Sequence, residues 1–365
     1  MSQPLDFPTL KKPVKLDYNA FIDNILRKGT PKRVHFVELF LDKEMQEAID
    51  RRYGVTAGID KNDPHYAQKC LVAMQRFLGY DYVRTGAEGV DMEFKGETIA
   101  DTATTLPKEQ GRGWMAERNG PIASWEDFEK YRWPDLSKAR TDDLEWYSKN
   151  LPADMCIIPH CGAWCEHHCW LMGYETLCFA LYDQPDLVDA IHQKLVDLEL
   201  AKIKLLLQFD RVKVVWASDD MGFKTSTMLS LEHMRKYVLS GHKMLSEISH
   251  KAGRPYILHA CGNRSQIYED LIEDVKLDAI HSFEDTIELV TDTKANYGKR
   301  LSLLGGLDVD FLCRSNIDQV RRRTRETLKT CMPGGGYALG TGNSVTNYIP
   351  MDNFLAMLDE GRRYA

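Results

Sequence analysis

Eight short runs of apolar and β-branched residues recur along the 365-residue chain, each followed by a polar or glycine-rich tip and an amphipathic helix. The runs are 34–40, 81–85, 156–161, 212–216, 255–259, 279–283, 301–304 and 337–340. Several are apolar without alternation, which is typical of strands buried on both faces. Strands that alternate with helices form parallel sheets, and eight such units favour a closed (β/α)8 TIM barrel, an α/β fold.

The segments between these runs carry the signals of helices. Pro185 stands where the first residue of a helix would lie, and apolar residues follow it at helical spacing. Ser230 is expected to cap another helix, which would end at Gly253. No Gly-x-Gly-x-x-Gly follows the first run, so the sequence lacks the main signature of a dinucleotide-binding sheet.

The runs divide the chain into an extension, a barrel and an insertion. Residues 1–29 precede the first run and form an N-terminal extension, with a short helix expected near residues 18–28. Residues 30–365 form the barrel. The connection between the second and third runs is too long for one helix, and about residues 94–150 are expected to form a lid over the barrel mouth.

Composition limits the class of protein. The formal net charge is -7, so nothing indicates a nucleic-acid partner. No apolar run is long enough to cross a bilayer, and the N-terminus lacks the basic and apolar regions of a signal peptide. The nine cysteines are an odd number, which favours free thiols or metal ligands over a disulfide framework. We therefore expect a cytoplasmic enzyme without a membrane partner.

Polar and ionisable residues follow nearly every predicted strand. In barrel enzymes the active site lies at the C-terminal ends of the strands, where packing alone would not require such residues. The residues that we expect to contact substrate are Arg84, His160, Glu166, His281, Thr341 and Asn343, and those expected to act in catalysis are Glu38, Asp219 and Asp220.

The pair His259 and Cys261 is the most specific of these signals. A strand places residues i and i+2 on the same face, so the imidazole and the thiol would lie side by side. Nitrogen and sulfur are the ligands that zinc prefers, and a catalytic zinc needs a third protein ligand and an open position. The alternative is a buried histidine beside an inert cysteine. The pair stands at a strand end and precedes Gly262, which favours a metal site more than an isolated His-x-Cys pair would. Both interpretations, half of a zinc site and a buried pair without metal, therefore stay open.

Two further clusters leave their roles open. The acids Asp219 and Asp220 would serve as a general base, a metal ligand or an anchor for a cationic group, or else as a helix or turn cap. The segment 160–169 is rich in histidine and cysteine but lacks any standard zinc spacing. Its cysteines, four residues apart, are better explained as packing residues on one helical face.

Five segments together resemble the uroporphyrinogen decarboxylase superfamily, in the expected order from about residue 30 to the C-terminus. They are 30–38, 217–222, 259–263, 304–308 and 333–337. The resemblance implies a shared barrel that carries two main kinds of enzyme. One is uroporphyrinogen decarboxylase, which needs no cofactor. The other is a group of zinc methyltransferases that move methyl groups between a corrinoid protein and a small molecule, and His259 and Cys261 are similar to its first two zinc ligands.

The sequence departs from both kinds of enzyme. The decarboxylases carry an Arg-Gln-Ala-Gly-Arg segment that binds substrate carboxylates, but residues 37–42 here are acidic and apolar, which suits a polycarboxylate poorly. The methyltransferases have a third zinc ligand, a cysteine, at the tip of the last strand, where this chain has Thr341. The residues left to complete a zinc site are Glu38, Cys161, Glu166 and Asp220.

The favoured interpretation is a methyltransferase or demethylase component that moves a methyl group between a small substrate and a corrinoid protein. Zinc at His259 and Cys261 would lower the pKa of a bound thiol acceptor. In a demethylase, Glu38 and the Asp219–Asp220 pair would hold or protonate the leaving group. Two alternatives remain: a porphyrinogen decarboxylase (a carboxy-lyase of porphyrin biosynthesis), and a non-catalytic partner of a corrinoid protein. A homodimer is expected from the resemblance alone.

Overall fold

A computed structural model describes residues 5–103, 105–108, 111–115 and 119–364, and confirms the α/β class. Six strands form one parallel sheet in chain order. They are β5 (His160–Cys161), β6 (Val215–Ser218), β7 (Tyr256–His259), β8 (Ala279–His281), β9 (Ser302–Leu304) and β10 (Tyr337–Ala338). A second parallel pair joins β1 (Tyr82–Val83) to β4 (Cys156–Ile157). Seven of the eight predicted runs thus contain a strand that pairs in parallel.

Isolated bridges extend the sheet at both edges. Phe36 in the first run pairs in parallel with Leu339 beyond β10, and Ile157 of β4 pairs in parallel with Val212 ahead of β6. Between the first run and β1 the contact is made by a side chain. The Tyr82 hydroxyl accepts from the Glu38 N–H and donates to the Glu38 carbonyl, at 3.0 Å each. The eight segments therefore follow one another in the order of a barrel, and the first run is less regular than its apolar pattern predicts.

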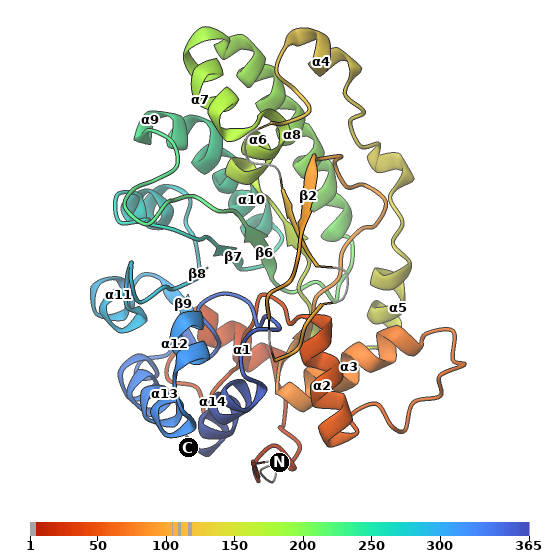
Figure 1. The fold of residues 1–365 in the computed structure, drawn as a ribbon, viewed down its shortest axis with the longest axis vertical. Helices are drawn as coiled ribbons and strands as arrows, with labels where there is room; N and C mark the ends of the chain where they lie inside the picture. The colour runs from red at the N-terminus through yellow and green to blue at the C-terminus, as the bar shows by residue number, and fades with distance from the viewer. Residues whose placement is uncertain (1–4, 104, 109–110, 116–118, 365) are drawn as a thin grey trace.

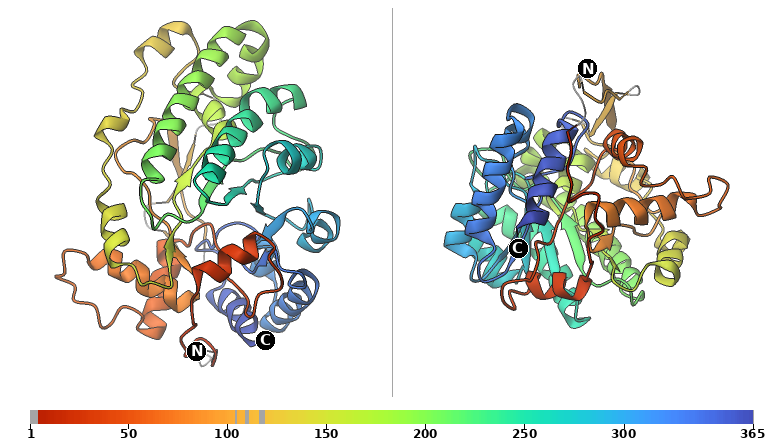
Figure 2. Two further views of the ribbon diagram at one scale, coloured as in Figure 1. Left: turned by 180° about the vertical axis from the view of Figure 1, so that it is seen from behind. Right: turned by 90° about the horizontal axis from the view of Figure 1, so that it is seen from below.

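The helices lie around the outside of the strands (Figures 1 and 2). They are α1 (Tyr18–Ile25), α2 (Lys43–Tyr53), α3 (Tyr66–Leu78), α4 (Trp125–Lys130), α5 (Asp142–Asn150), α6 (Trp164–Met172), α7 (Tyr174–Asp183), α8 (Pro185–Leu206), α9 (Leu231–His233), α10 (Ser240–Lys251), α11 (Val290–Tyr297), α12 (Val309–Arg314), α13 (Ile317–Cys331) and α14 (Met351–Arg363), with the short helices η1 (Leu136–Lys138), η2 (Met234–Leu239) and η3 (Asp270–Asp274).

The predicted helix ends are confirmed. Pro185 is the first residue of α8. The Ser230 side chain accepts from the His233 N–H at the start of α9, and the helical run from α9 through η2 and α10 ends just before Gly253, which has φ +69°. Among the described residues, no helix combines the length and hydropathy that a bilayer span requires.

The extension closes the N-terminal end of the strands. Helix α1 places Asn24 where its side chain donates to the Tyr337 carbonyl (2.7 Å) and accepts from the Gly336 N–H (3.0 Å), at the start of β10. The backbone N–H of Asp17, the cap of α1, donates to Asp81 ahead of β1 at 2.7 Å. The helix expected near residues 18–28 is present as α1, and these contacts place it at the N-terminal end of the strands.

The insertion after β1 reaches the opposite, C-terminal end of the strands with its hairpin. It contains an antiparallel hairpin of β2 (Gly96–Ile99) and β3 (Arg112–Met115), followed by α4, η1 and α5. Lys108, between the two strands, forms an ion pair with Asp42 at 2.9 Å. Asp101 accepts a hydrogen bond at 2.7 Å from the side-chain amide of Asn347, which lies in the loop after β10. These contacts place the hairpin beside the strand ends where the active site was expected. Residues 104, 109, 110 and 116–118 of the insertion lie outside the described part.

Candidate metal centre at the strand ends

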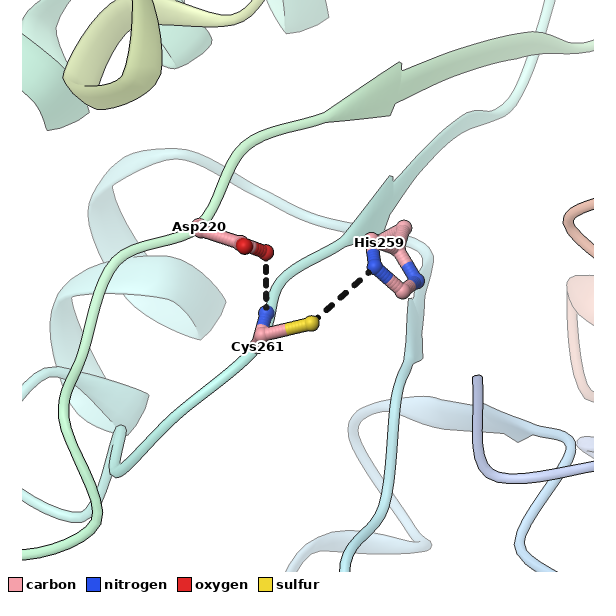
Figure 3. Close-up of side chains that lie close together, drawn as sticks. All are labelled: Asp220, His259 and Cys261. Atoms are coloured by element: carbon pink, nitrogen blue, oxygen red, sulfur yellow. Dashed lines mark hydrogen bonds between the residues drawn. The ribbon is translucent and has the colours of Figure 1, made fainter. Parts of the chain in front are cut away.

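His259 and Cys261 lie side by side, as their spacing predicts. The Cys261 Sγ is 3.3 Å from the His259 Nε2 (Figure 3). Asp220 joins them, and the three potential ligand atoms lie within 4.8 Å of one another. His259 is buried, whereas Asp220 and Cys261 keep partial exposure. A nitrogen, a sulfur and an oxygen donor thus converge on one point that remains open on one side.

The parallel pairing of β6 and β7 brings Asp220 to this point. Ser218 pairs with His259, so the residues that follow the two strands remain neighbours. The Asp220 carboxylate accepts from the Cys261 backbone N–H at 3.2 Å, as Figure 3 shows. Gly262 allows the close approach of the two loops. It has φ +83°, and a Cβ there would lie 1.8 Å from the Gly222 carbonyl oxygen.

His281 holds the ring of His259. It pairs with His259 in register between β7 and β8, and the two Nδ1 atoms lie 2.6 Å apart. Burial, with Arg84 and Arg264, lowers the pKa of His281 to about 3, and burial followed by the charge of His281 lowers the pKa of His259. Both rings are therefore neutral near pH 7. One Nδ1 donates to the other, which leaves the His259 Nε2 facing Cys261. A neutral imidazole held from its far nitrogen is the usual arrangement of a metal-binding histidine.

Two side chains donate hydrogen bonds to the Cys261 sulfur. The Asn343 amide lies 3.2 Å from Sγ and the Ser282 hydroxyl lies 3.6 Å away. Burial, followed by the charge of Asp220, raises the pKa of Cys261. The free thiol is therefore protonated near pH 7, and these donors would favour the thiolate when a cation replaces the proton. Ser282 has φ +91°, a strained conformation for a residue with a side chain, at the point where it contacts the site.

The neighbouring acid Asp219 is turned away from the three ligands. Its buried carboxylate accepts the N–H groups of Trp164, Cys165 and Glu166, at 2.9, 3.0 and 2.9 Å, at the start of α6. It also lies 2.9 Å from the His242 Nε2. Asp219 thus has the capping role that was one alternative for this pair, whereas Asp220 lies with the potential metal ligands and its role stays a prediction.

The comparisons with known proteins show the family to which the chain belongs. The family model for uroporphyrinogen decarboxylase (URO-D) matches residues 109–364. The chain belongs to this family. No curated protein sequence matches the chain. Among solved structures it is similar to a methyltransferase from Methanosarcina mazei, at 14% identity over 95% of this chain and 98% of that one, with a TM-score of 0.67.

Two other solved structures match over most of this chain but superimpose on it less well. A B12-independent methionine synthase from Shewanella sp. W3-18-1 in complex with selenomethionine is 12% identical, over 92% of this chain and 94% of that chain, with a TM-score of 0.44. A putative vitamin-B12 independent methionine synthase from Listeria monocytogenes is 12% identical, over 91% and 95%, with a TM-score of 0.45. The M. mazei structure, with the higher TM-score of these three, shows that the chain shares its fold.

The tip of the last strand differs from the ends of β6 and β7, where the three potential ligands converge. Thr341, at its tip, bonds to Glu38 from the first run. The Glu38 carboxylate accepts from the Thr341 N–H at 2.7 Å and lies 2.5 Å from the Thr341 Oγ1. Burial raises the pKa of Glu38 to about 8, although the two Thr341 bonds act against this. Glu38 and Thr341 thus engage each other, and neither belongs to the group of three ligands.

Glu166 and Glu284 add acidic groups beside Asp220. Burial, followed by the charges of Asp220 and Asp219, raises the pKa of Glu166 to about 9. Burial, followed by the charge of Asp308, raises the pKa of Glu284, on which Asp220 also acts. Glu166 therefore carries a proton near pH 7, and a neutral carboxylic acid lies close to the potential metal ligands.

Arg84 and His160 lie at the ends of β1 and β5, and their contact with substrate stays a prediction. The Arg84 guanidinium donates to the Leu39 carbonyl at 2.7 Å and to the His160 Nδ1 at 3.1 Å. It lies 4.5 Å from the centre of the Trp216 ring, which in turn contacts the His281 ring at 5.6 Å. A positive charge therefore stands between His160 and the histidine pair.

Sequence reasoning missed two residues that support the site. One is Ser282, whose positive φ has no sequence signal in a non-glycine residue. The other is Arg264, a fully buried arginine that donates to the Ala260 carbonyl, to the Ser282 carbonyl (2.8 Å) and to Glu288. Arg264 ties the loop after β7 to the loop after β8. Only its position three residues after Cys261 could have drawn attention to it.

Proposed function

We propose that this chain is a zinc-dependent methyltransferase component that moves a methyl group between a small substrate and a corrinoid protein. The observation that carries the proposal is the convergence of Asp220, His259 and Cys261 at the ends of β6 and β7. Membership of the URO-D family supports it, because the superfamily's methyltransferases carry a His-x-Cys pair at the corresponding place. The fold similarity to the M. mazei methyltransferase is consistent with the same class.

The three residues offer the types of donor atom that zinc takes. Catalytic zinc sites use three protein ligands drawn from nitrogen, sulfur and oxygen, and keep one position open. Tetrahedral bonds of about 2.0–2.3 Å place ligand atoms roughly 3.3–3.8 Å apart, and the 3.3 Å between His259 Nε2 and Cys261 Sγ falls in that range. The partial exposure of Asp220 and Cys261 leaves room for a fourth ligand from solvent or substrate.

The residues around the three ligands have separate tasks. Bound zinc would supply a Lewis acid that lowers the pKa of a substrate thiol or hydroxyl. His281 holds the His259 ring, and Asn343 and Ser282 stabilise the Cys261 thiolate through their hydrogen bonds. Glu166, neutral near pH 7 beside Asp220, is placed to donate a proton to a leaving group when the reaction removes a methyl group.

Metal analysis of the purified protein tests the proposal. We expect one zinc per chain in the wild type and in Cys313→Ala, a control because Cys313 lies on α12 away from the three ligands. Cys261→Ala should lose the metal and the methyl transfer to a reconstituted corrinoid protein. The absence of stoichiometric metal from the wild type contradicts the proposal. So does release of carbon dioxide from uroporphyrinogen, which belongs to the decarboxylase. Unchanged methyl transfer in His259→Ala would reduce the chain to a docking partner.

A further inference from the structure

A second cavity, of about 320 Å³, lies at the N-terminal end of the strands, away from the candidate metal centre. Three segments line it: residues 9–14 of the N-terminal extension, residues 33–36 at the start of the first run, and residues 361–364 at the end of α14. The end of α14 lies beside the C label in Figure 1. A cavity of this volume has room for a small molecule.

Every charged side chain that lines this cavity is a cation. The three are Lys12, Arg33 and Arg362. Arg33 forms an ion pair with the buried Asp81 ahead of β1, so its charge is matched within the chain. Among the described residues, Lys12 and Arg362 form no ion pair with a carboxylate. Two positive charges of the wall therefore have no counter-ion in the described part of the chain.

The acidic residues nearest to the cavity on α14 are already paired. Asp359 forms ion pairs with Arg321 at 2.7 Å and with Arg363 at 2.9 Å. Glu360 forms ion pairs with Arg321 and Arg325, at 3.0 Å each. Since each of these carboxylates is engaged by two arginines, neither offsets the charges that line the cavity.

Arg362 is the more buried of the two unmatched cations. Its guanidinium donates to the carbonyls of Thr9 (3.1 Å), Lys12 (3.3 Å) and Phe77. Its Nε is buried and has no hydrogen-bond partner among the described residues. Burial lowers the pKa of Arg362 to about 10, and the charge of Arg33 acts in the same direction. Arg362 is therefore still charged near pH 7, and an anion beside it would stabilise this charge.

The rest of the wall is mainly apolar. Val34 and Phe36 are buried, and Val14 and Tyr364 are half-buried beside them. Pro13 completes this side. Such a surface packs well against the organic part of a ligand whose charged group faces the cations.

We propose that this cavity binds a phosphate monoester with a small organic body. Such a phosphate carries a charge of about −1.5 to −2 at pH 7, which matches the two unpaired cations, and guanidinium and ammonium groups are its usual partners in proteins. The ligand would contact the extension, the first run and α14 together, so its binding holds the extension on the barrel. This site is separate from the candidate metal centre, and it does not depend on the proposed methyl transfer.

Calorimetric titration with phenyl phosphate tests the inference. We expect saturable binding of one molecule per wild-type chain. Lys12→Glu reverses an exposed charge in the wall and should weaken the binding at least about tenfold. Lys11→Glu is the matched control, because Lys11 is exposed next to it, pairs with Asp6 at 2.8 Å and does not line the cavity. It changes the net charge equally and should bind as the wild type does. Phenyl sulfate, with one negative charge, should bind the wild type more weakly.

Three results would overturn the inference. The first is the absence of saturable phenyl phosphate binding to the wild type. The second is an equal loss of affinity in Lys12→Glu and Lys11→Glu, which would indicate a general effect of net charge. The third is an unchanged affinity in Val14→Trp, because an indole there should fill the cavity and abolish binding without altering any charge. Failure of the proposed function, through missing zinc or methyl transfer, would leave phenyl phosphate binding intact.

Discussion

Two regions of the mouth use similar residue types in opposite ways. At the ends of β6 and β7, Asp220, His259 and Cys261 converge and leave one side open. Between the first run and β10, Glu38 and Thr341 bond each other through two contacts, at 2.7 and 2.5 Å. Both regions hold a carboxylate at a strand end. Only at the ends of β6 and β7 does the carboxylate lie beside a nitrogen and a sulfur donor with which it could share a cation.

The difference concerns the third metal ligand, which this chain lacks at the position where the methyltransferases have it. In the methyltransferases that the sequence resembles, a cysteine stands at the tip of the last strand, where this chain has Thr341. Under the proposed function, the third ligand atom would come from Asp220 in the loop after β6, while Thr341 at the tip of the last strand is bonded to Glu38. The nearby Asn343 keeps a contact with the site by donating to the Cys261 sulfur.

The largest effect should come from Asp220. We expect Asp220→Asn to lose stoichiometric zinc and to lower kcat for methyl transfer by about 10²- to 10³-fold, since an amide is a much weaker ligand and the site loses a charge. Glu38→Gln is the matched control in the other region and should keep its zinc. Zinc content by atomic absorption and turnover with a corrinoid protein measure both. If Glu38→Gln lost zinc and Asp220→Asn kept it, the assignment of the two regions would be reversed.

A smaller effect is expected from His281, which holds the ring of His259. His281→Phe keeps the ring volume but removes the bond to the His259 Nδ1, and should weaken zinc binding by about 10- to 100-fold. Competition with a chelator measures the affinity. His65→Phe, at an exposed imidazole before α3, should leave it unchanged. An unchanged affinity in His281→Phe would mean that β7 alone orients the ligand.

Much of the fold could be predicted because its signals are local. Buried strands and helix caps such as Pro185 and Ser230 depend on neighbouring residues, and the structure has them where they were expected. His259 and Cys261 were found for the same reason, because a strand fixes which residues share a face. The irregular first run was not foreseen, since its pairing depends on contacts with β10 and with the Tyr82 side chain.

The rest of the site depends on contacts between distant segments. Asp219 and Asp220 are adjacent and chemically identical, and only the position of α6 decides that Asp219 caps a helix while Asp220 faces Cys261. The role of His281 follows from the register between β7 and β8.

The Glu38–Thr341 region should reveal itself through pH-dependent stability. Because the pKa of Glu38 is raised to about 8, the folded chain keeps a proton that the unfolded chain releases above about pH 4.5. The contribution to stability is therefore fully present at low pH and is lost as pH rises through 8. Between pH 6 and 9 the free energy of urea unfolding should fall by about 2–3 kcal/mol more in the wild type than in Glu38→Gln. Equal losses in both proteins would show that Glu38 titrates normally.

The smallest effect should come from Thr341→Val, which removes one hydrogen bond to Glu38 and keeps the shape of the side chain. The Thr341 N–H still donates to the carboxylate, so the free energy of unfolding should fall by only about 1 kcal/mol. Zinc content and kcat should stay within about twofold of the wild type, because Thr341 contacts none of the three ligands in the described structure. Loss of zinc in this variant would place Thr341, like the cysteine that it replaces, among the metal ligands. A change in stability with unchanged zinc content is the result expected if Thr341 bonds to Glu38 alone and takes no part in metal binding.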